Sequence, residues 1–325
     1  MPAKPLTIPN PDTVAFIADR GDARDRLDRA IVRRVHDVSS LSRARVQHWI
    51  ADGRVLIDEV VTRRPATRPR EGATIRILLP STAARRVAPE PEPGQLAILY
   101  EDQELLVLDK PAGVVVHPSY RNSSGTLLNV VLGHLRGRGI TTSPGIVTRL
   151  DKDTSGLVVI ATAPRGHHTL QQDGAQGRLD KLYLAVVAGI PPERGAITLP
   201  LDRDPADRRR MVATPAGMRA ETRYVRLASA DGCSLVRCEL VTGRTHQIRV
   251  HLAASGFPLL GDPLYGTPHP ALDRQALHAW RVRGLHPTTR DPFEAEAPPP
   301  ADLRAAFPAL FAAWRGDGRD TPLPG

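Results

Sequence analysis

The 325-residue sequence contains only two cysteines, Cys233 and Cys238, which are too few for a disulfide framework. Aromatic residues make up 4 % of it, and no apolar run approaches the roughly 20 residues that a membrane-spanning helix needs. The first ten residues are rich in proline and lack the apolar segment of a secretory signal. We therefore expect a reduced, cytoplasmic protein without a membrane partner, whose two cysteines lie on opposite faces of one strand.

The sequence also lacks the short motifs that mark several enzyme classes. It has no Walker loop, no dinucleotide-binding glycine pattern and no HExxH zinc motif. It has no GxSxG motif of the kind found in serine hydrolases. The eleven histidines do not cluster as ligands, so we expect no metal site.

Lysine is scarce as well, because only four of the 44 basic residues are lysines. The basic residues exceed the 35 acidic ones and give a net charge of +9, which favours a polyanionic partner. Arginine matches the geometry of phosphate groups, so the partner that we expect is RNA. Three of the four lysines, Lys110, Lys152 and Lys181, lie in motifs described below.

Composition and periodicity divide the chain into five parts. A proline-rich start becomes briefly extended from Thr13 to Ala18, and helical periodicity begins at Gly21. A second proline-rich stretch reads as a semi-rigid linker. The expected parts are an N-terminal extension (1–20), a small α/β domain (21–82), a linker (83–94), a large domain (95–316) and a C-terminal tail (317–325).

The small domain combines two short helices with a hairpin. Leu27, Ile31 and Val35 form one face of the first helix. Ser42 is the expected N-cap of the second helix, and Gly53 stands where a C-terminal glycine belongs. The stretch from residue 21 to 82 has 13 arginines and 8 acidic residues, so more than half of the net charge lies on a fifth of the chain.

Three segments of this domain resemble the S-four-like RNA-binding domain: Arg26-Leu-Asp28, Ser42-Arg-Ala-Arg45 and Asp52-Gly-Arg-Val-Leu-Ile57. The resemblance implies that Arg43, Arg45 and Arg54 contact RNA. A helical hairpin whose arginines only keep it in solution is the alternative.

The large domain is rich in strands that do not alternate regularly with helices, so we expect an α+β fold with a mainly antiparallel sheet and flanking helices. The expected strands cover residues 96–100, 105–109, 157–163, 181–188, 196–201, 220–227 and 234–241. The expected helices cover residues 126–137, 164–176, 245–255 and 301–315.

Three segments of the large domain could carry chemistry. A polar turn with Arg149, Asp151, Lys152 and Asp153 runs directly into a buried strand, which would mount charged groups at the rim of a rigid sheet. An aspartate in a loop is, however, more often only a turn former.

The other two segments supply a cation and an aromatic ring. Arg249 stands between Ile248 and Val250, so it is expected to be partly buried and to need an anion. Tyr183 shares one face of a strand with Lys181 and Ala185, and it could form a platform for a flat ring.

These segments resemble the RluA/RluD family of pseudouridine synthases, in the branch with an N-terminal S-four-like domain. The resemblance extends from about Gly21 to the C-terminal helix. It rests on Val107-Leu-Asp-Lys-Pro-Ala-Gly-Val-Val-Val-His-Pro118, Arg149-Leu-Asp-Lys-Asp-Thr-Ser-Gly156, Lys181-Leu-Tyr183, Gly243-Arg-Thr-His-Gln-Ile-Arg249, Gly261-Asp-Pro-Leu-Tyr-Gly266 and Asp273-Arg-Gln-Ala-Leu-His-Ala279.

The resemblance implies that Asp151 is the catalytic aspartate, that Tyr183 is the active-site tyrosine and that Arg249 forms a salt bridge with Asp151, with Arg244 as the second choice. The chain departs from the family at Thr148, where members often have histidine, which leaves any role of a histidine there in doubt. Further substrate or RNA contacts are expected from Arg149, Lys181, Lys152, Lys110, Arg244, His246 and Gln247. For the three lysines a structural contact is the alternative to a phosphate contact.

The implied reaction isomerises uridine to pseudouridine within RNA and needs no cofactor. The Leu-Leu-Asn129 and Asp273-Arg-Gln275 segments favour 23S rRNA, of the stem-loop 69 type, and thus a precursor of the large ribosomal subunit as partner. Transfer RNA and other rRNA uridines stay open as substrates. A catalytically inactive ribosome-assembly factor and a glycoside hydrolase, which would need two opposed carboxylates, are the rival functions. We expect a monomer.

Overall fold

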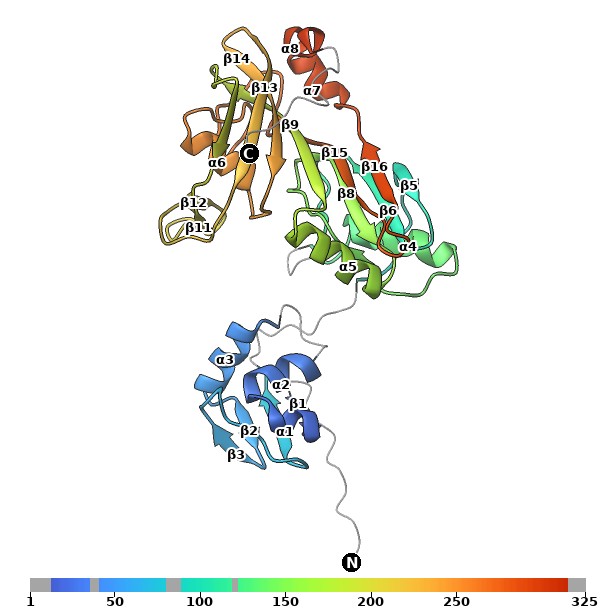
Figure 1. The fold of residues 1–325 in the computed structure, drawn as a ribbon, viewed down its shortest axis with the longest axis vertical. Coiled ribbons are helices and arrows are strands. Elements are labelled where there is room, and N and C mark those ends of the chain that lie inside the picture. The colour runs from blue at the N-terminus through green and yellow to red at the C-terminus, as the bar shows by residue number, and fades with distance from the viewer. Residues whose placement is uncertain (1–12, 36–40, 80–88, 119–121, 315–325) are drawn as a thin grey trace, which may run out of the picture. The chain divides into compact units, whose positions relative to one another are not determined.

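The computed structural model describes residues 13–35, 41–79, 89–118 and 122–314, and it divides the chain into two compact units, Met1–Pro89 and Glu90–Gly325 (Figure 1). The predicted tail (317–325) and the first twelve residues lie outside the described part. None of the helices in that part is long and apolar enough to span a lipid bilayer.

The smaller unit packs helices against one four-stranded sheet of order β1-β4-β2-β3. The helix that was expected after Ser42 begins there, because the Ser42 hydroxyl accepts a hydrogen bond from the Arg45 backbone N–H (3.2 Å). Its elements are β1 (Thr13–Ile17), α1 (Arg20–Arg24), α2 (Leu27–Arg34), α3 (Arg43–Ala51), β2 (Val55–Ile57), β3 (Val60–Thr62) and β4 (Thr74–Leu78).

The predicted start of this domain at residue 21 is too late. Strand β1 pairs with β4 along its whole length, from Thr13 opposite Leu78 to Ile17 opposite Thr74. The extended stretch is therefore a strand of the sheet, and it helps to cover the core formed by α2, α3 and β4.

The larger unit is built on a ten-stranded sheet whose main order is β10-β13-β14-β9-β15-β8-β6-β5. All of its pairs are antiparallel except β8 with β15, which confirms the predicted α+β class with a mainly antiparallel sheet. The first elements of the larger unit are β5 (Ile98–Glu101), β6 (Leu105–Lys110), α4 (Leu127–Gly137), β7 (Gly145–Ile146), β8 (Ser155–Ala161), α5 (Pro164–Ala175), β9 (Asp180–Ala188), β10 (Arg194–Ile197), β11 (Leu201–Arg203) and β12 (Met211–Ala213). Its later elements are β13 (Thr222–Ala230), β14 (Cys233–Leu240), α6 (Gln247–Ala254), β15 (Leu277–Leu285), β16 (Pro292–Glu296), α7 (Ala301–Ala306) and α8 (Pro308–Ala313).

Each face of this sheet carries its own core. Helices α4, α5 and α6 pack on the face to which Tyr183 and Ala185 of β9 point, whereas α7 and α8 pack on the face of Leu182 and Leu184. The two cysteines, both in β14, follow the same alternation: Cys238 belongs to the first core and Cys233 packs against the second. They lie on opposite faces, as expected.

Several predicted boundaries are wrong. The stretch 196–201 contains the end of β10 and the start of β11, and helix 301–315 is interrupted at Phe307, after which Pro308 opens α8. Residue 315 lies outside the described part. Strand β15 was missed because His278, Arg281 and Arg283 break its apolar pattern. It is nevertheless a central strand, which pairs with β8 on one side and with β9 on the other.

The predicted linker 83–94 is too long. Residues 83–88 lie outside the described part, but residues 90–94 belong to the larger unit. The Asn129 side-chain amide donates to the Glu90 carbonyl oxygen (2.7 Å), and the Glu92 carboxylate accepts from the Gly125 backbone N–H (2.9 Å).

Gly156 lies in β8 just after the turn that carries Asp151, and it pairs with Lys110 of β6 and Ala279 of β15. Its φ of +107° lies in a region that favours glycine, and a Cβ here would overlap the Ala279 carbonyl oxygen. The close approach of β15 therefore requires glycine at this position.

We predict that Gly156→Ala lowers the free energy of unfolding of the larger unit by about 2–4 kcal/mol, because backbone strain and steric overlap add. Urea unfolding of the full chain measures the change. Gly137→Ala is the matched control: this helical glycine has open space around its missing Cβ, and its substitution should change stability by no more than about 1 kcal/mol. Equal effects of the two substitutions would contradict the prediction.

Candidate active site

The turn between β7 and β8 carries Asp151 and is held by buried polar groups. The Lys110 ammonium donates to the carbonyl oxygens of Lys152 (2.9 Å) and of Val114 and Pro111. The Gln275 amide donates to the Thr154 hydroxyl (3.1 Å). The turn is therefore anchored from β6 and from the segment that precedes β15.

Lys110 was expected to contact phosphate or to have a structural role. It has no exposed surface, and burial lowers its pKa to about 8, so its role is the structural one. Asn129 is buried at the start of α4, where its carboxamide oxygen accepts from the Thr126 backbone N–H. Its segment indicated the substrate through resemblance only, and its burial does not test that indication. Arg274 and Gln275 are also buried, and they hold the turn of Asp151.

Thr148, the departure from the family pattern, has a structural role as well. Its hydroxyl accepts a hydrogen bond from the Val159 backbone N–H (2.9 Å), which ties the start of the turn to β8.

One guanidinium links two carboxylates at the centre of the site. Arg249 projects from the first turn of α6, and its Nη1 donates to Asp151 Oδ2 (2.7 Å). Its Nε and Nη2 donate to the two oxygens of Asp262 (2.7 and 2.8 Å). The anion that the apolar neighbours of Arg249 led us to expect is therefore a pair of carboxylates.

The two carboxylates differ in exposure. The Asp262 side chain is fully buried and also accepts from the backbone N–H groups of Leu264 (2.9 Å) and Tyr265 (3.2 Å), whereas the Asp151 side chain is 27 % exposed. Asp262 thus has its acceptors filled by the protein. Asp151 is the end of this network that a ligand can reach.

Electrostatics keep Arg249 and Asp262 charged. Burial opposes the charge on Asp262, but the hydrogen bonds and charge of Arg249 and the two backbone donors hold its pKa below the usual range. Burial likewise opposes the charge on Arg249, but Asp262 and Asp151 raise its pKa.

Tyr183 lies in β9 on the sheet face that carries α6, and it is 5 % exposed. Burial, and after it the charge of Asp151, raise the pKa of its phenol, so the ring stays neutral near pH 7. Lys181, two residues before it, is half-buried. Both line a cavity of about 10 Å³, which has room for about one water molecule.

The other predicted site residues of the segment Gly243–Arg249 have different roles. Gln247 is buried, and its amide binds Thr242, Thr222 and the backbone of Glu221, so the structure contradicts its predicted RNA contact. Arg244 is half-buried and donates to the Arg219 carbonyl oxygen (3.1 Å), so the second choice for the ion pair was wrong.

The predicted RNA contacts on the protein surface stay predictions. Arg149 and Lys152 are exposed on either side of Asp151. In the smaller unit Arg43 pairs with Asp28 (2.9 Å), Arg45 lies over the Trp49 ring (5.5 Å) and Arg54 is half-buried.

Sequence reasoning missed Asp262 and Tyr265, although both stand in the quoted Gly261–Gly266 segment. The available signal was that a buried arginine needs carboxylate partners for its hydrogen-bond donors. It also placed His246 only among the RNA contacts. His246 is the N-cap of α6, and its Nε2 lies 3.8 Å from Asp151 Oδ2.

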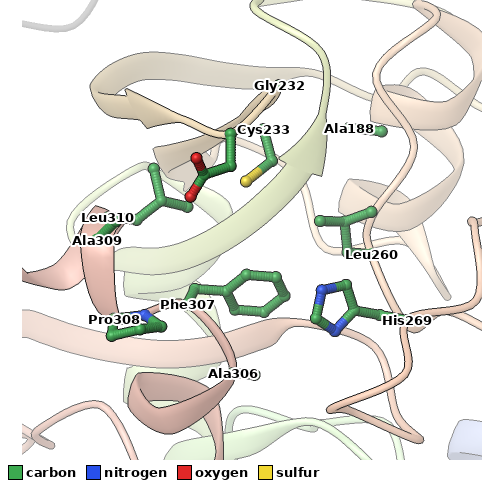
Figure 2. A pocket seen from close by; sticks show the side chains of 11 residues that line it. Ala188, Gly232, Cys233, Leu260, His269, Ala306, Phe307, Pro308, Ala309 and Leu310 are labelled. Carbon is green, nitrogen blue, oxygen red and sulfur yellow. The ribbon is translucent and has the colours of Figure 1, made fainter.

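A larger cavity, of about 270 Å³, lies elsewhere, between the β13–β14 turn and the start of α8 (Figure 2). Leu260, Phe307 and Leu310 line it, and they belong to the core on the sheet face opposite Tyr183. None of the predicted site residues lies in it. Across the described ranges, no three histidine, cysteine or acidic side chains group as metal ligands.

Comparisons with known proteins show the family to which the chain is similar. The family model described as RNA pseudouridylate synthase matches residues 104–254, which include Asp151, Tyr183 and Arg249. The "Ribosomal large subunit pseudouridine synthase D" of Xanthomonas campestris pv. campestris is 39 % identical over 283 residues, 83 % of this chain and 85 % of that protein. An "Uncharacterized RNA pseudouridine synthase" of Chloroflexus aurantiacus is 43 % identical over 291 residues, 88 % of this chain and 90 % of that protein.

A solved structure supports the fold assignment as well. "Human RNA Pseudouridylate Synthase Domain Containing 1" superposes with a TM-score of 0.52 at 27 % identity, covering 69 % of this chain and 90 % of that one. The chain therefore belongs to the RluA/RluD family of RNA pseudouridine synthases.

Proposed function

We propose that Asp151 is the catalytic carboxylate of an RNA pseudouridine synthase whose substrate is uridine in the rRNA of the large ribosomal subunit. The observation that carries the proposal is the 2.7 Å contact between Arg249 Nη1 and Asp151 Oδ2, at the exposed end of an otherwise buried network. Of the three charged residues in this network, Asp151 is the one that is both exposed and held in a fixed orientation.

The reaction breaks the bond between ribose C1′ and uracil N1 and forms one between C1′ and C5. The C5 proton leaves and N1 gains a proton, so the reaction is a net isomerisation. A target base inside RNA must first leave its stack, at a cost of about a few kcal/mol. Tyr183 is neutral and lies on the same sheet face as α6, but it is 5 % exposed beside a cavity for about one water molecule. Stacking on the extruded uracil, a contact worth about 1–3 kcal/mol, therefore requires this part of the site to open.

The surroundings of Asp151 favour a nucleic acid over a sugar polymer. A glycoside hydrolase needs a second working carboxylate, but Asp262 is buried with both oxygens bound to Arg249 and to the backbone. Arg149 and Lys152 are exposed next to Asp151 and supply cations for the phosphates on either side of the target. An inactive assembly factor would have no chemical need for this constellation.

The substrate assignment rests on relatives. Those from Xanthomonas campestris pv. campestris and Nitrosomonas europaea bear the name "Ribosomal large subunit pseudouridine synthase D". We propose 23S rRNA as the substrate of this chain, with tRNA as the alternative. Such a substrate implies work in the cytoplasm, and we propose a monomer, because one chain supplies every group of the Asp151 site.

We also propose that the smaller unit is an S-four-like RNA-binding domain. Its helix α3 carries the exposed Arg43 and the half-buried Arg45, while its apolar residues form a core of its own. Its contribution would be affinity and register through phosphate contacts, which weaken with salt.

We predict that Asp151→Asn lowers single-turnover pseudouridine formation on transcribed 23S rRNA by at least about 10³-fold, because the amide neither accepts protons nor acts as a nucleophile at that position. RNA binding should change little. Asp153→Asn, in the same turn, is the matched control and should keep near-normal activity. Substantial turnover by the Asp151 variant would refute the assignment.

We predict that a chain without residues 1–89 folds and still converts uridine in a short RNA, because the larger unit has its own two cores. Its affinity for a long rRNA fragment should fall at least about tenfold and depend less on salt, since phosphate contacts are lost. Titrations at two salt concentrations measure this. A folded truncation that is inactive on the short RNA, or one that binds the long RNA like the full chain, contradicts the prediction.

A further inference from the structure

Tyr265 lies where three parts of the larger unit meet, and no role has yet been given to it. Its hydroxyl oxygen accepts a hydrogen bond from the Met211 backbone N–H (2.7 Å), at the start of β12. The same hydroxyl is 2.8 Å from His246 Nδ1, at the start of α6. Its backbone N–H donates to Asp262, the partner of Arg249.

Met211 closes a hairpin that is rich in arginine. This arginine hairpin consists of β11, β12 and residues 204–210 between them, and it contains Arg203, Arg208, Arg209 and Arg210. Tyr265, Met211 and Val250 of α6 share a small apolar cluster beneath it. The Tyr265 hydroxyl therefore bonds the hairpin at the point where the hairpin packs on α6.

The ring of Tyr265 lies between the same two parts. The guanidinium carbon of Arg249 is 5.1 Å from the ring centroid, and that of Arg210, from the hairpin, is 5.0 Å away. Both distances are within the range of a cation–π contact. One aromatic ring thus contacts the cation that binds Asp151 and a cation of the hairpin.

His246 completes the link to the carboxylate. Because the Tyr265 oxygen accepts from Met211, its own proton is free to be donated to His246 Nδ1. In that assignment His246 Nε2 carries the ring proton and faces Asp151 Oδ2 at 3.8 Å. His246 has a positive φ of 54°, a conformation that a non-glycine residue keeps only where its surroundings hold it.

We infer that Tyr265 is a positioning residue that couples the arginine hairpin to the Asp151 site, so that the hairpin, His246 and Arg249 keep one arrangement around the carboxylate. The inference rests on the proposed function of Asp151. It adds that the hydroxyl of Tyr265 is needed both for the anchoring of the hairpin and for the rate of the chemical step.

The test uses Tyr265→Phe in the full chain, which keeps the ring and its packing and removes the hydroxyl. The unpartnered Met211 N–H should let the hairpin open more often, so tryptic cleavage at Arg208–Arg210, mapped by mass spectrometry, should become about tenfold faster. Single-turnover rate at saturating RNA should fall about tenfold, while the melting temperature stays within about 3 °C of that of the wild type.

Two further variants separate this role from general destabilisation. Tyr100→Phe removes a hydroxyl that donates to Asp102 (2.7 Å) in the edge strand β5, and it should change neither readout. His246→Gly suits the positive φ and removes the imidazole. It should lower turnover without faster hairpin cleavage, because the bond from Met211 to Tyr265 remains.

Faster cleavage together with slower turnover in Tyr265→Phe supports the coupling. A change in only one of the two, or a parallel rise in cleavage at every tryptic site, overturns it. Hairpin cleavage is read without RNA, so the anchoring remains testable even if Asp151→Asn proves active and the proposed function fails.

Discussion

The guanidinium of Arg249 between Asp262 and Asp151 is the interaction on which the rest of the site depends. A buried cation is costly unless its hydrogen-bond donors are paired with acceptors, and for Arg249 these acceptors are carboxylates. Asp262 supplies two of the bonds and is itself neutralised by Arg249 and two backbone donors. Of the other donors of Arg249, Nη1 binds Asp151. The position of the Asp151 carboxylate is thus held by a buried residue.

The sheet provides the rigid frame for this arrangement. Strand β8 begins at the end of the Asp151 turn, packed between β6 and β15, and Gly156 permits the close approach of β15. Lys110 and Gln275 bind the turn from opposite neighbours. Each is a buried polar group with partners in the protein, which rigidifies a site at the cost of tolerance to substitution. In the function that we propose, preorganisation of this kind fixes the Asp151 carboxylate before the substrate arrives.

Local signals predicted much of this structure. The Ser42 cap, the helices of the smaller unit, most strands of the larger one and the burial of Arg249 all follow from neighbouring residues. Features that depend on distant partners did not follow. Strand β15 holds His278, whose ring is satisfied by Ser155 and by the Ala297 carbonyl oxygen, so its polar residues hid a central strand. Gln247 was taken for an RNA contact for the same reason. Asp262 was overlooked because nothing next to it in the chain reveals its pairing with Arg249.

A double-mutant cycle between Arg249 and Asp262 tests the central claim most directly, because it asks whether the two residues act as one unit on Asp151. Single-turnover pseudouridine formation would be compared for Arg249→Lys, Asp262→Asn and the double variant, each checked for folding. Each single change should cost about 100-fold through misplacement of the guanidinium, and the double variant should lose no more than the worse single one. Losses that multiply would show that Asp262 acts independently of Arg249 and would contradict the account.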